Sequence, residues 1–126
     1  MIYLDSSIVL ARLFAEDRSP PDALWSQSLI SSRLLEYEVL NRVHARAALR
    51  AGDARQFIDR VNLLDLSSRV LARAPEPFPL PVCTLDGLHL ATINFLRAHG
   101  QIFHVASYDQ RLAAGAEALG FPLAKL

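Results

Sequence analysis

The sequence predicts an α/β fold, a three-layer α/β/α sandwich in which helices cover both faces of a central, mostly parallel sheet of four to five strands. Two observations lead to this fold class. Short apolar runs rich in β-favouring residues alternate along the chain with longer segments whose apolar residues recur at helical spacing. The first apolar run, residues 1–4, is followed at once by an acid and two serines, which indicates a strand that leads directly into a helix.

The predicted elements alternate from one end of the chain to the other. Strands are expected at residues 1–4, 28–32, 64–66, 102–106 and 121–126. Helices are expected at residues 8–14, 23–27, 33–51, 54–64, 69–74, 85–99 and 110–119. Capping side chains indicate where helices start, and the candidates are Ser6 or Ser7, Asp53, Ser67 or Ser68, and Thr84. Glycines indicate where helices end, at Gly52, Gly100 and Gly120. The 126 residues show no repeat or linker, so we expect a single domain, residues 1–126.

Composition narrows the class of protein. The 52% hydrophobic content favours a well-buried globular core, and the balance of 13 basic against 13 acidic residues lacks the basic excess usual in nucleic-acid-binding proteins. The only cysteine, Cys83, excludes an internal disulfide and fits a reducing compartment, so we expect a cytoplasmic protein. Asp5 interrupts the first apolar run too early for a signal peptide, and no apolar stretch approaches the roughly 20 residues that a membrane span needs.

Two aspartates are predicted to reach one edge of the sheet, and a third aspartate is a further candidate for the same site. Asp5 follows the first strand, and Asp109 follows the strand at 102–106 in the same way. In a parallel sheet both strand ends lie at the carboxyl edge, where open α/β sheets build their ligand sites. Asp86 opens the helix after a loop with four prolines, although a carboxylate in a first helical turn is also a simple partner of the helix dipole.

The long helix at 33–51 offers two further acids. Glu36 and Glu38 lie about 200° apart around a helix, so they face opposite ways. Glu38 is the better candidate for an inward carboxylate, and Glu36 for a solvated one. Arg42 lies one turn beyond Glu38, and a plain ion pair between them is the alternative interpretation.

Carboxylates that converge in one cleft stay ionised together only with a compensating cation. An all-oxygen cluster favours a hard ion, Mg²⁺ or Mn²⁺. The chemistry that such a site most often supports is hydrolysis of a phosphodiester, in which the metal activates a water molecule and offsets charge on the leaving oxygen.

Four short motifs, in this order, resemble those of the PIN-domain ribonucleases, and most closely the VapC toxins of bacterial type II toxin–antitoxin systems. They are Tyr3-Leu4-Asp5-Ser6-Ser7, then residues 31–40 (SSRLLEYEVL), residues 85–91 (LDGLHLA) and residues 107–112 (SYDQRL). The resemblance spans essentially the whole chain and implies a PIN-like fold. It also implies that four acids are both the metal ligands and the catalytic residues: Asp5, Glu38, Asp86 and Asp109. Ser6 and Ser107 match supporting positions, while Gly87 departs from the alanine that is commoner in the family.

The resemblance implies a Mg²⁺- or Mn²⁺-dependent endoribonuclease that acts on RNA. Because the metal would activate water rather than the 2′-hydroxyl, we expect a 5′-phosphate and a 3′-hydroxyl at the cut. It further implies a VapB-like antitoxin that docks over the cleft, and a homodimer. His89 is interpreted as a buried histidine bonded to a neighbour or as a support for the site. An arginine stripe, Arg42, Arg46 and Arg50, is either a solvated helix face or a contact to the RNA backbone.

Other function classes fit less well. A phosphatase of the haloacid dehalogenase type needs a second acid two residues after Asp5, and that residue is Ser7. A phospho-acceptor receiver domain needs an acidic pair and a downstream lysine, and the only lysine is Lys125. A PIN-like domain that binds RNA or a protein without cutting is the remaining alternative; loss of one acid would indicate it, and none is missing.

Overall fold

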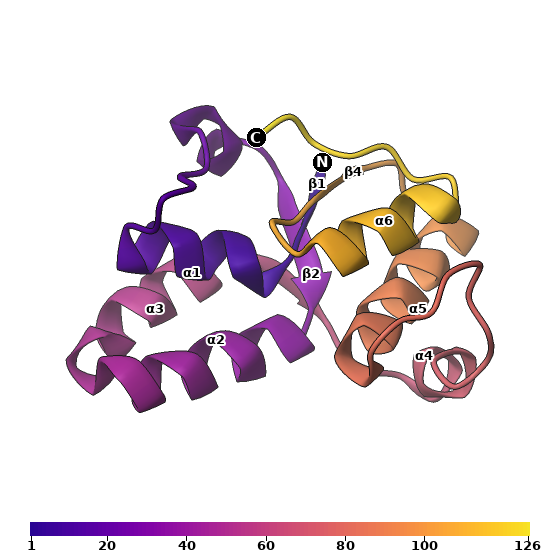
Figure 1. Cartoon of the computed structure of the whole chain (residues 1–126), viewed down its shortest axis with the longest axis horizontal. Helices are drawn as coiled ribbons and strands as arrows, with labels where there is room; N and C mark the ends of the chain where they lie inside the picture. The colour runs from indigo at the N-terminus through magenta and orange to yellow at the C-terminus, as the bar shows by residue number, and fades with distance from the viewer.

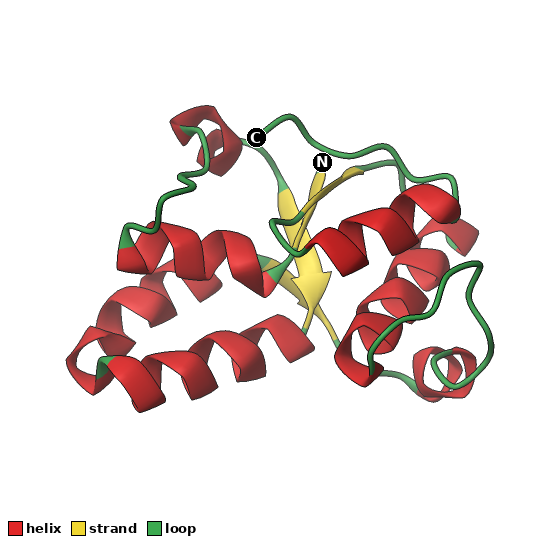
Figure 2. Cartoon of the chain, viewed as in Figure 1, coloured by secondary structure: helices red, strands yellow, loops and turns green.

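The computed structural model describes residues 1–126 and contains one all-parallel sheet with helices on both sides (Figures 1 and 2). The strands are β1 (Ile2–Leu4), β2 (Leu29–Ser32), β3 (Asn62–Leu64) and β4 (His104–Ala106), in the order β3-β2-β1-β4. The α-helices are α1 (Ser6–Phe14), α2 (Leu34–Arg46), α3 (Ala51–Ile58), α4 (Ser68–Arg73), α5 (Thr84–Ala98) and α6 (Gln110–Ala118), with 3₁₀ helices η1 (Asp22–Ser26) and η2 (Ala48–Arg50). The predicted three-layer, PIN-like α/β/α fold is confirmed.

The two helical layers come from the two halves of the chain. α1, α2 and α3 pack on one another on one side of the sheet, and on the other side α4 and α6 both pack on α5 (Figure 1). Each layer has its own apolar core, and the sheet separates them.

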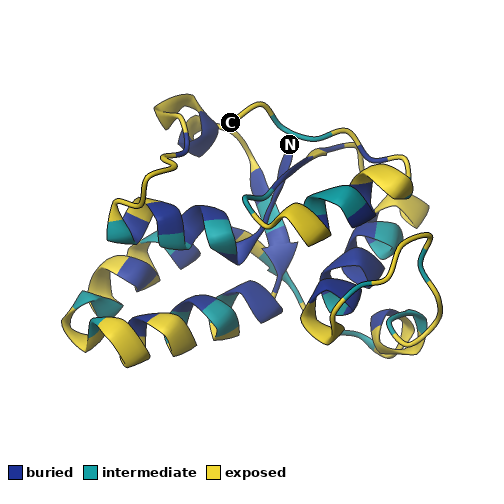
Figure 3. Cartoon of the chain, viewed as in Figure 1, coloured by how far each residue is buried: buried dark blue, intermediate teal, exposed yellow.

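Strand β1 lies at the centre of the fold. Ile2 and Leu4 point into the core beneath α1–α3, and Tyr3 points into the opposite core beneath α5 and α6. This alternation follows from the two-residue repeat of a strand, and a strand covered on both faces must be apolar on both. All three residues are buried, as are most of the central strands in Figure 3.

Parallel pairing brings the ends of the strands together. Leu4 pairs with Ala106, and the Asp5 amide donates to the Ala106 carbonyl at 3.0 Å. The residues that follow β1 and β4 are therefore neighbours at the carboxyl edge of the sheet, as the sequence predicts.

The helix predicted at 33–51 is not continuous, because these residues form α2, η2 and the first residue of α3. The backbone leaves the helical conformation at Ala47, so α2 ends at Arg46 and the chain turns through η2 into α3. The turn lets both helices pack on α1. The predicted stop at Gly52 and cap at Asp53 are therefore wrong, because both residues lie inside α3; packing overrides such local signals.

Smaller corrections concern strands and caps. The third strand lies at 62–64 rather than 64–66, because Asn62 pairs with Ile30. The strand predicted at 121–126 reduces to a single bridge between Leu123 and Val105, since Pro122 has no N–H to donate to a ladder. Cys83, not Thr84, precedes α5 as its N-cap.

The helix ends predicted at Gly100 and Gly120 are confirmed. Gly100 and Gly120 follow α5 and α6 with φ angles of 83° and 87°, which only glycine adopts without strain. Ser67 is the N-cap of α4, as one of the two predicted candidates. No helix is long and apolar enough to cross a membrane.

Candidate active site

Asp5 stands where β1 passes into α1, and it is the N-cap of that helix. Its Oδ2 accepts hydrogen bonds from Ser7 Oγ at 2.6 Å, from the Ser7 amide at 3.3 Å and from Ser107 Oγ at 2.8 Å. The cap predicted at Ser6 or Ser7 is wrong, because the carboxylate of Asp5 already reaches the amide two residues on. Oδ1 accepts no hydrogen bond, so one oxygen of this buried carboxylate is held and the other is free.

The serines around Asp5 have unequal roles. Ser7 Oγ also accepts from the Tyr108 amide at 2.9 Å, so it joins α1 to the loop after β4. Ser107, one of the two predicted supporting residues, contacts Asp5 directly. Ser6, the other, makes no side-chain hydrogen bond, although it lines a cavity together with Asp5 and Ser7. Its supporting role stays a prediction. Sequence reasoning missed Ser7, and the signal for it was its place two residues after a capping acid.

Glu38 projects from α2 toward Asp5, whereas Glu36 faces away. Glu36 forms ion pairs with Arg33 at 3.2 Å and with Arg55 at 3.3 Å. Glu38 is instead bonded to His89, and no ion pair with Arg42 forms. Helical periodicity therefore predicts correctly which of the two glutamates faces inward, and the alternative of a Glu38–Arg42 pair is wrong.

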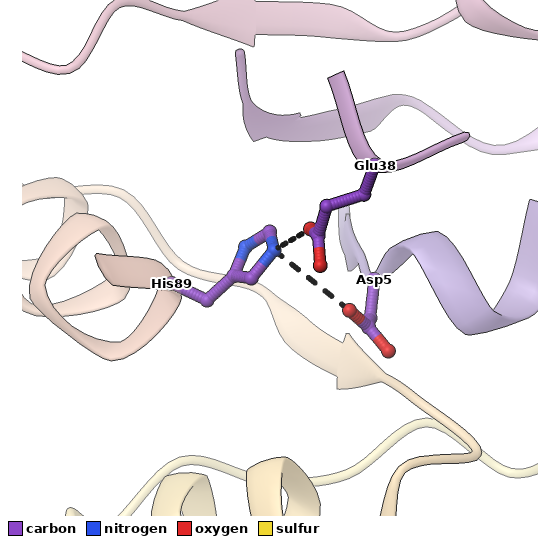
Figure 4. Close-up of side chains that lie close together, drawn as sticks. All are labelled: Asp5, Glu38 and His89. Carbon is purple, nitrogen blue, oxygen red and sulfur yellow. Dashed lines mark hydrogen bonds and ion pairs between the residues drawn. The ribbon is translucent and has the colours of Figure 1, made fainter. Parts of the chain in front are cut away.

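His89 on α5 points one ring nitrogen toward both Glu38 and Asp5 (Figure 4). Its Nε2 is 2.6 Å from Glu38 Oε1 and 3.9 Å from Asp5 Oδ1, while its Nδ1 is 2.7 Å from the hydroxyl of Tyr3. Burial disfavours the imidazolium, but the hydrogen bond to Glu38 and the charges of Asp5 and Glu38 outweigh it and raise the pKa of His89. The predicted buried histidine bonded to a neighbour is confirmed.

Asp86 and Asp109 complete the acidic set from the first turn of α5 and the start of α6. Burial, reinforced by the charge of Asp109, raises the pKa of Asp86. Asp109 is exposed and caps α6, where its Oδ1 accepts from the amides of Arg111 and Leu112. Its other oxygen makes no hydrogen bond.

All four acids line one cavity of about 420 Å³ at the carboxyl edge of the sheet. The other lining residues are Ser6, Ser7, Leu10, Tyr37, Asn41, Arg42 and Leu85. A cavity with four carboxylates and a single arginine has excess negative charge, and the free oxygens of Asp5, Glu38 and Asp109 are hard ligands. The donor set therefore fits a hard divalent cation. Ligand atoms of Asp5, Glu38 and His89 all lie within 4.8 Å of one another.

The predicted arginine stripe is broken, because Arg42 and Arg46 lie on α2 whereas Arg50 lies in η2. Arg46 lies over the ring of Phe14 and pairs with Glu16, and Arg50 pairs with Asp53. Arg42 has no such partner and lines the acidic cavity.

Comparison with known proteins places the chain in a family. No family model matches the sequence. Two relatives from Mycobacterium tuberculosis align over nearly the whole chain: Ribonuclease VapC46 is 32% identical over 94% of this chain and 92% of its own length, and Ribonuclease VapC47 is 28% identical over 96% and 93%.

A solved structure supports the fold alone. A chain of a toxin–antitoxin complex from Klebsiella pneumoniae superposes with a TM-score of 0.65 over 94% of both chains at 18% sequence identity. The fold, the order of the acidic motifs and the identity to VapC46 over nearly the full length agree. The chain belongs to the VapC family of ribonucleases.

Proposed function

We propose that this protein is the toxin of a bacterial toxin–antitoxin pair and that it hydrolyses RNA in the acidic cavity with Mg²⁺ or Mn²⁺. Residues 1–126 act as one PIN-like nuclease domain, in the cytoplasm where the RNA is. The observation that carries the proposal is that four carboxylates from four separate parts of a VapC-family chain line one cavity at the carboxyl edge of the sheet.

Asp5, Glu38, Asp86 and Asp109 would hold the metal. When bound, a divalent ion lowers the pKa of a water molecule and offsets charge on the phosphodiester. Asp5 offers the free Oδ1, because Ser7 and Ser107 hold Oδ2. Asp109 offers one oxygen while the other caps α6.

The histidines support hydrolysis by water over attack by the RNA 2′-hydroxyl. That second route needs a general base and an acid near the phosphate. His89 is buried and bonded on both nitrogens, and the other three histidines, His44, His99 and His104, lie outside the cavity. The proposal therefore includes products with a 5′-phosphate and a 3′-hydroxyl.

The RNA backbone would meet Arg42 at the rim. A guanidinium is well suited to phosphate, and this one is not neutralised by a carboxylate of the chain. The same rim would receive an antitoxin of the VapB type, with an arginine of the partner paired to the acids in place of metal.

A homodimer is also part of the proposal. Several large apolar side chains are exposed, with Leu49 102% and Ile102 87% accessible, and a subunit contact that covered some of them would be favourable because it buries apolar surface. Size-exclusion chromatography with light scattering tests this: a monodisperse monomer at high concentration contradicts the dimer.

The test of function is cleavage of an RNA pool by the purified chain with Mg²⁺, with EDTA, and in the variant Asp5→Asn. We expect cutting only by the unmodified chain with metal. Asp59→Asn is the matched control, because Asp59 is exposed, lies at the end of α3 and makes no ion pair. RNA that is bound but never cut, under any divalent ion, would favour the non-catalytic alternative.

A further inference from the structure

Tyr3 and His89 are two buried polar side chains beside the site to which the proposed hydrolysis gives no role. Tyr3 is 0% exposed and His89 is 1% exposed. Burying a hydroxyl and an imidazole is unfavourable unless both are hydrogen-bonded, and apolar residues would fill this core at no such cost. Their presence needs a reason.

The two residues form a hydrogen-bonded chain that ends on Glu38. The Tyr3 hydroxyl lies 2.7 Å from His89 Nδ1, and the two rings meet edge to face at 86°. His89 Nε2 then lies 2.6 Å from Glu38 Oε1 (Figure 4). These hydrogen bonds run from Tyr3 in β1 through His89 in α5 to Glu38 in α2. They therefore connect Glu38 to β1, the most buried strand of the sheet.

The direction of the hydrogen bonds follows from the partners. Tyr3 keeps its proton, because burial raises its pKa far above the usual value. In a neutral imidazole, Tyr3 donates to Nδ1 and the ring proton sits on Nε2; in an imidazolium, both nitrogens carry protons. In either state Nε2 donates to Glu38 Oε1, and Nε2 has no lone pair to offer.

We propose that Tyr3 and His89 are positioning residues that fix Glu38 by Oε1 and leave Oε2 free for the divalent ion, and that His89 is not itself a ligand. The inference rests on the proposed function, because it deepens the account of the same metal site. It explains how Glu38, on a partly exposed helix face, gains the fixed orientation that Ser7 and Ser107 give to Asp5.

The rival assignment is His89 as a direct ligand. The distances alone permit it, since ligand atoms of Asp5, Glu38 and His89 lie within 4.8 Å of one another. A direct ligand would have to give up a proton and its 2.6 Å hydrogen bond to Glu38, and would leave that carboxylate without a donor.

Mn²⁺ titration calorimetry on the full chain tests the inference. Loss of a residue that orients a metal ligand lowers metal affinity about 10–100-fold, which we expect for His89→Asn. Tyr3→Phe keeps the ring and removes only the hydroxyl, and we expect a loss of about tenfold, at the low end of the same range. His89→Gln can place an amide N–H near the position of Nε2, and should recover most of the affinity lost in His89→Asn.

The control is Ile93→Val, one turn further along α5 in the same buried face. It removes a methylene from the core and lowers stability, but should leave Mn²⁺ affinity within about twofold. Unchanged affinity in both Tyr3→Phe and His89→Asn, or an equal loss in Ile93→Val, would overturn the inference. A chain that folds but binds no Mn²⁺ at all would instead overturn the proposed function, and the inference with it.

Pulsed electron paramagnetic resonance separates positioning from ligation. A directly bound imidazole gives a ¹⁴N coupling to Mn²⁺, which His89→Gln would remove. The inference expects no such coupling in the unmodified chain. A ¹⁴N coupling that disappears in His89→Gln would show that His89 is a ligand and contradict it.

Discussion

The two halves of the acidic cavity are built differently. Asp5 and Glu38 are each held by donors from distant parts of the chain, Asp5 by Ser107 and Glu38 by His89. Asp86 and Asp109 rely on local structure: the Asp109 carboxylate accepts hydrogen bonds only from amides of its own helix, and Asp86 lies in the first turn of α5.

The difference indicates which half would already be formed before the proposed metal ion binds. Each of Asp5 and Glu38 has one carboxylate oxygen held by hydrogen bonds and one free. Their orientation is therefore set without an ion. Burial, and after it the charge of Asp109, raises the pKa of Asp86, so this carboxylate is unfavourably ionised without a cation. We infer that the first half sets the position of the metal and that the second half gains most from its charge.

The largest effect is expected in the half of the cavity that Asp5 and Glu38 form. Asp5→Asn keeps the volume and the cap, since asparagine caps helices as well as aspartate, but removes a ligand charge. We expect kcat/KM for RNA cleavage to fall more than about a hundredfold, beyond what losing an outer partner costs. Initial rates on one RNA, with thermal unfolding to show an intact fold, measure this. Cleavage within a few-fold of the unmodified chain would break the comparison.

A smaller loss of cleavage activity is expected in the half that Asp86 and Asp109 form. Asp109→Asn keeps the cap of α6, so stability should stay unchanged while cleavage falls about 10–100-fold. Asp109→Ala should lose the same activity and, in addition, about 1 kcal/mol of unfolding free energy with the cap. The pair of variants separates the metal role from the helix role. If both variants cut RNA as well as the unmodified chain, Asp109 is only a cap.

Ser7 and Ser6 test the support of Asp5. Ser7→Ala removes a donor to Asp5 and the acceptor of the Tyr108 amide, so we expect a loss of about 1–3 kcal/mol in chemical denaturation. Ser6→Ala removes a hydroxyl without a hydrogen bond and should cost less than about 0.5 kcal/mol. A larger loss at Ser6 than at Ser7 would reverse this assignment.

The raised pKa of Asp86 gives a pH dependence in the absence of metal. An acid with a raised pKa in the folded state destabilises the fold as it ionises; the effect is absent below its ordinary value of 3.8 and develops as pH rises through the raised value. Metal-free Asp86→Asn should therefore melt above the unmodified chain at neutral pH, and the gap should close toward pH 3.8. Saturating Mg²⁺ should reverse the ranking, because it stabilises the unmodified chain. A gap that widens on acidification would contradict the assignment.

The smallest effect is expected at the rim. Arg42→Ala should raise KM a few-fold and lower the slope of log affinity against log salt by about 0.7, the share of one phosphate contact on a single strand. Arg50→Ala is the control, because Arg50 already pairs with Asp53. Equal salt slopes in both variants would remove Arg42 from the RNA path.

The parts that sequence predicts here are those fixed by local pattern. The apolar run before Asp5 specifies β1, and the 100° step of a helix separates Glu38 from Glu36. The position of Asp109 directly after the last predicted internal strand places it at the same edge as Asp5. These features depend on residues close together in the chain, so a single sequence carries them.

The parts that it misses depend on distant partners. Tyr3 and His89 are 86 residues apart, and His89 and Glu38 are 51 residues apart. No rule based on sequence spacing predicts hydrogen bonds between residues so far apart. The break between α2 and α3 arises where both helices must pack on α1, against the local signals of Gly52 and Asp53. The choice of Ser7 over Ser6 depends on the loop after β4, through the Tyr108 amide.

End-group analysis of the RNA fragments tests the central claim most directly. The cavity holds four carboxylates and no histidine free to act as a base, so we predict a 5′-phosphate and a 3′-hydroxyl at each cut. A substrate with one 2′-deoxy nucleotide at the cut site should still be cleaved if it binds. A 2′,3′-cyclic phosphate on the upstream fragment, with loss of cutting in the 2′-deoxy substrate, would contradict hydrolysis by a metal-activated water in this cavity.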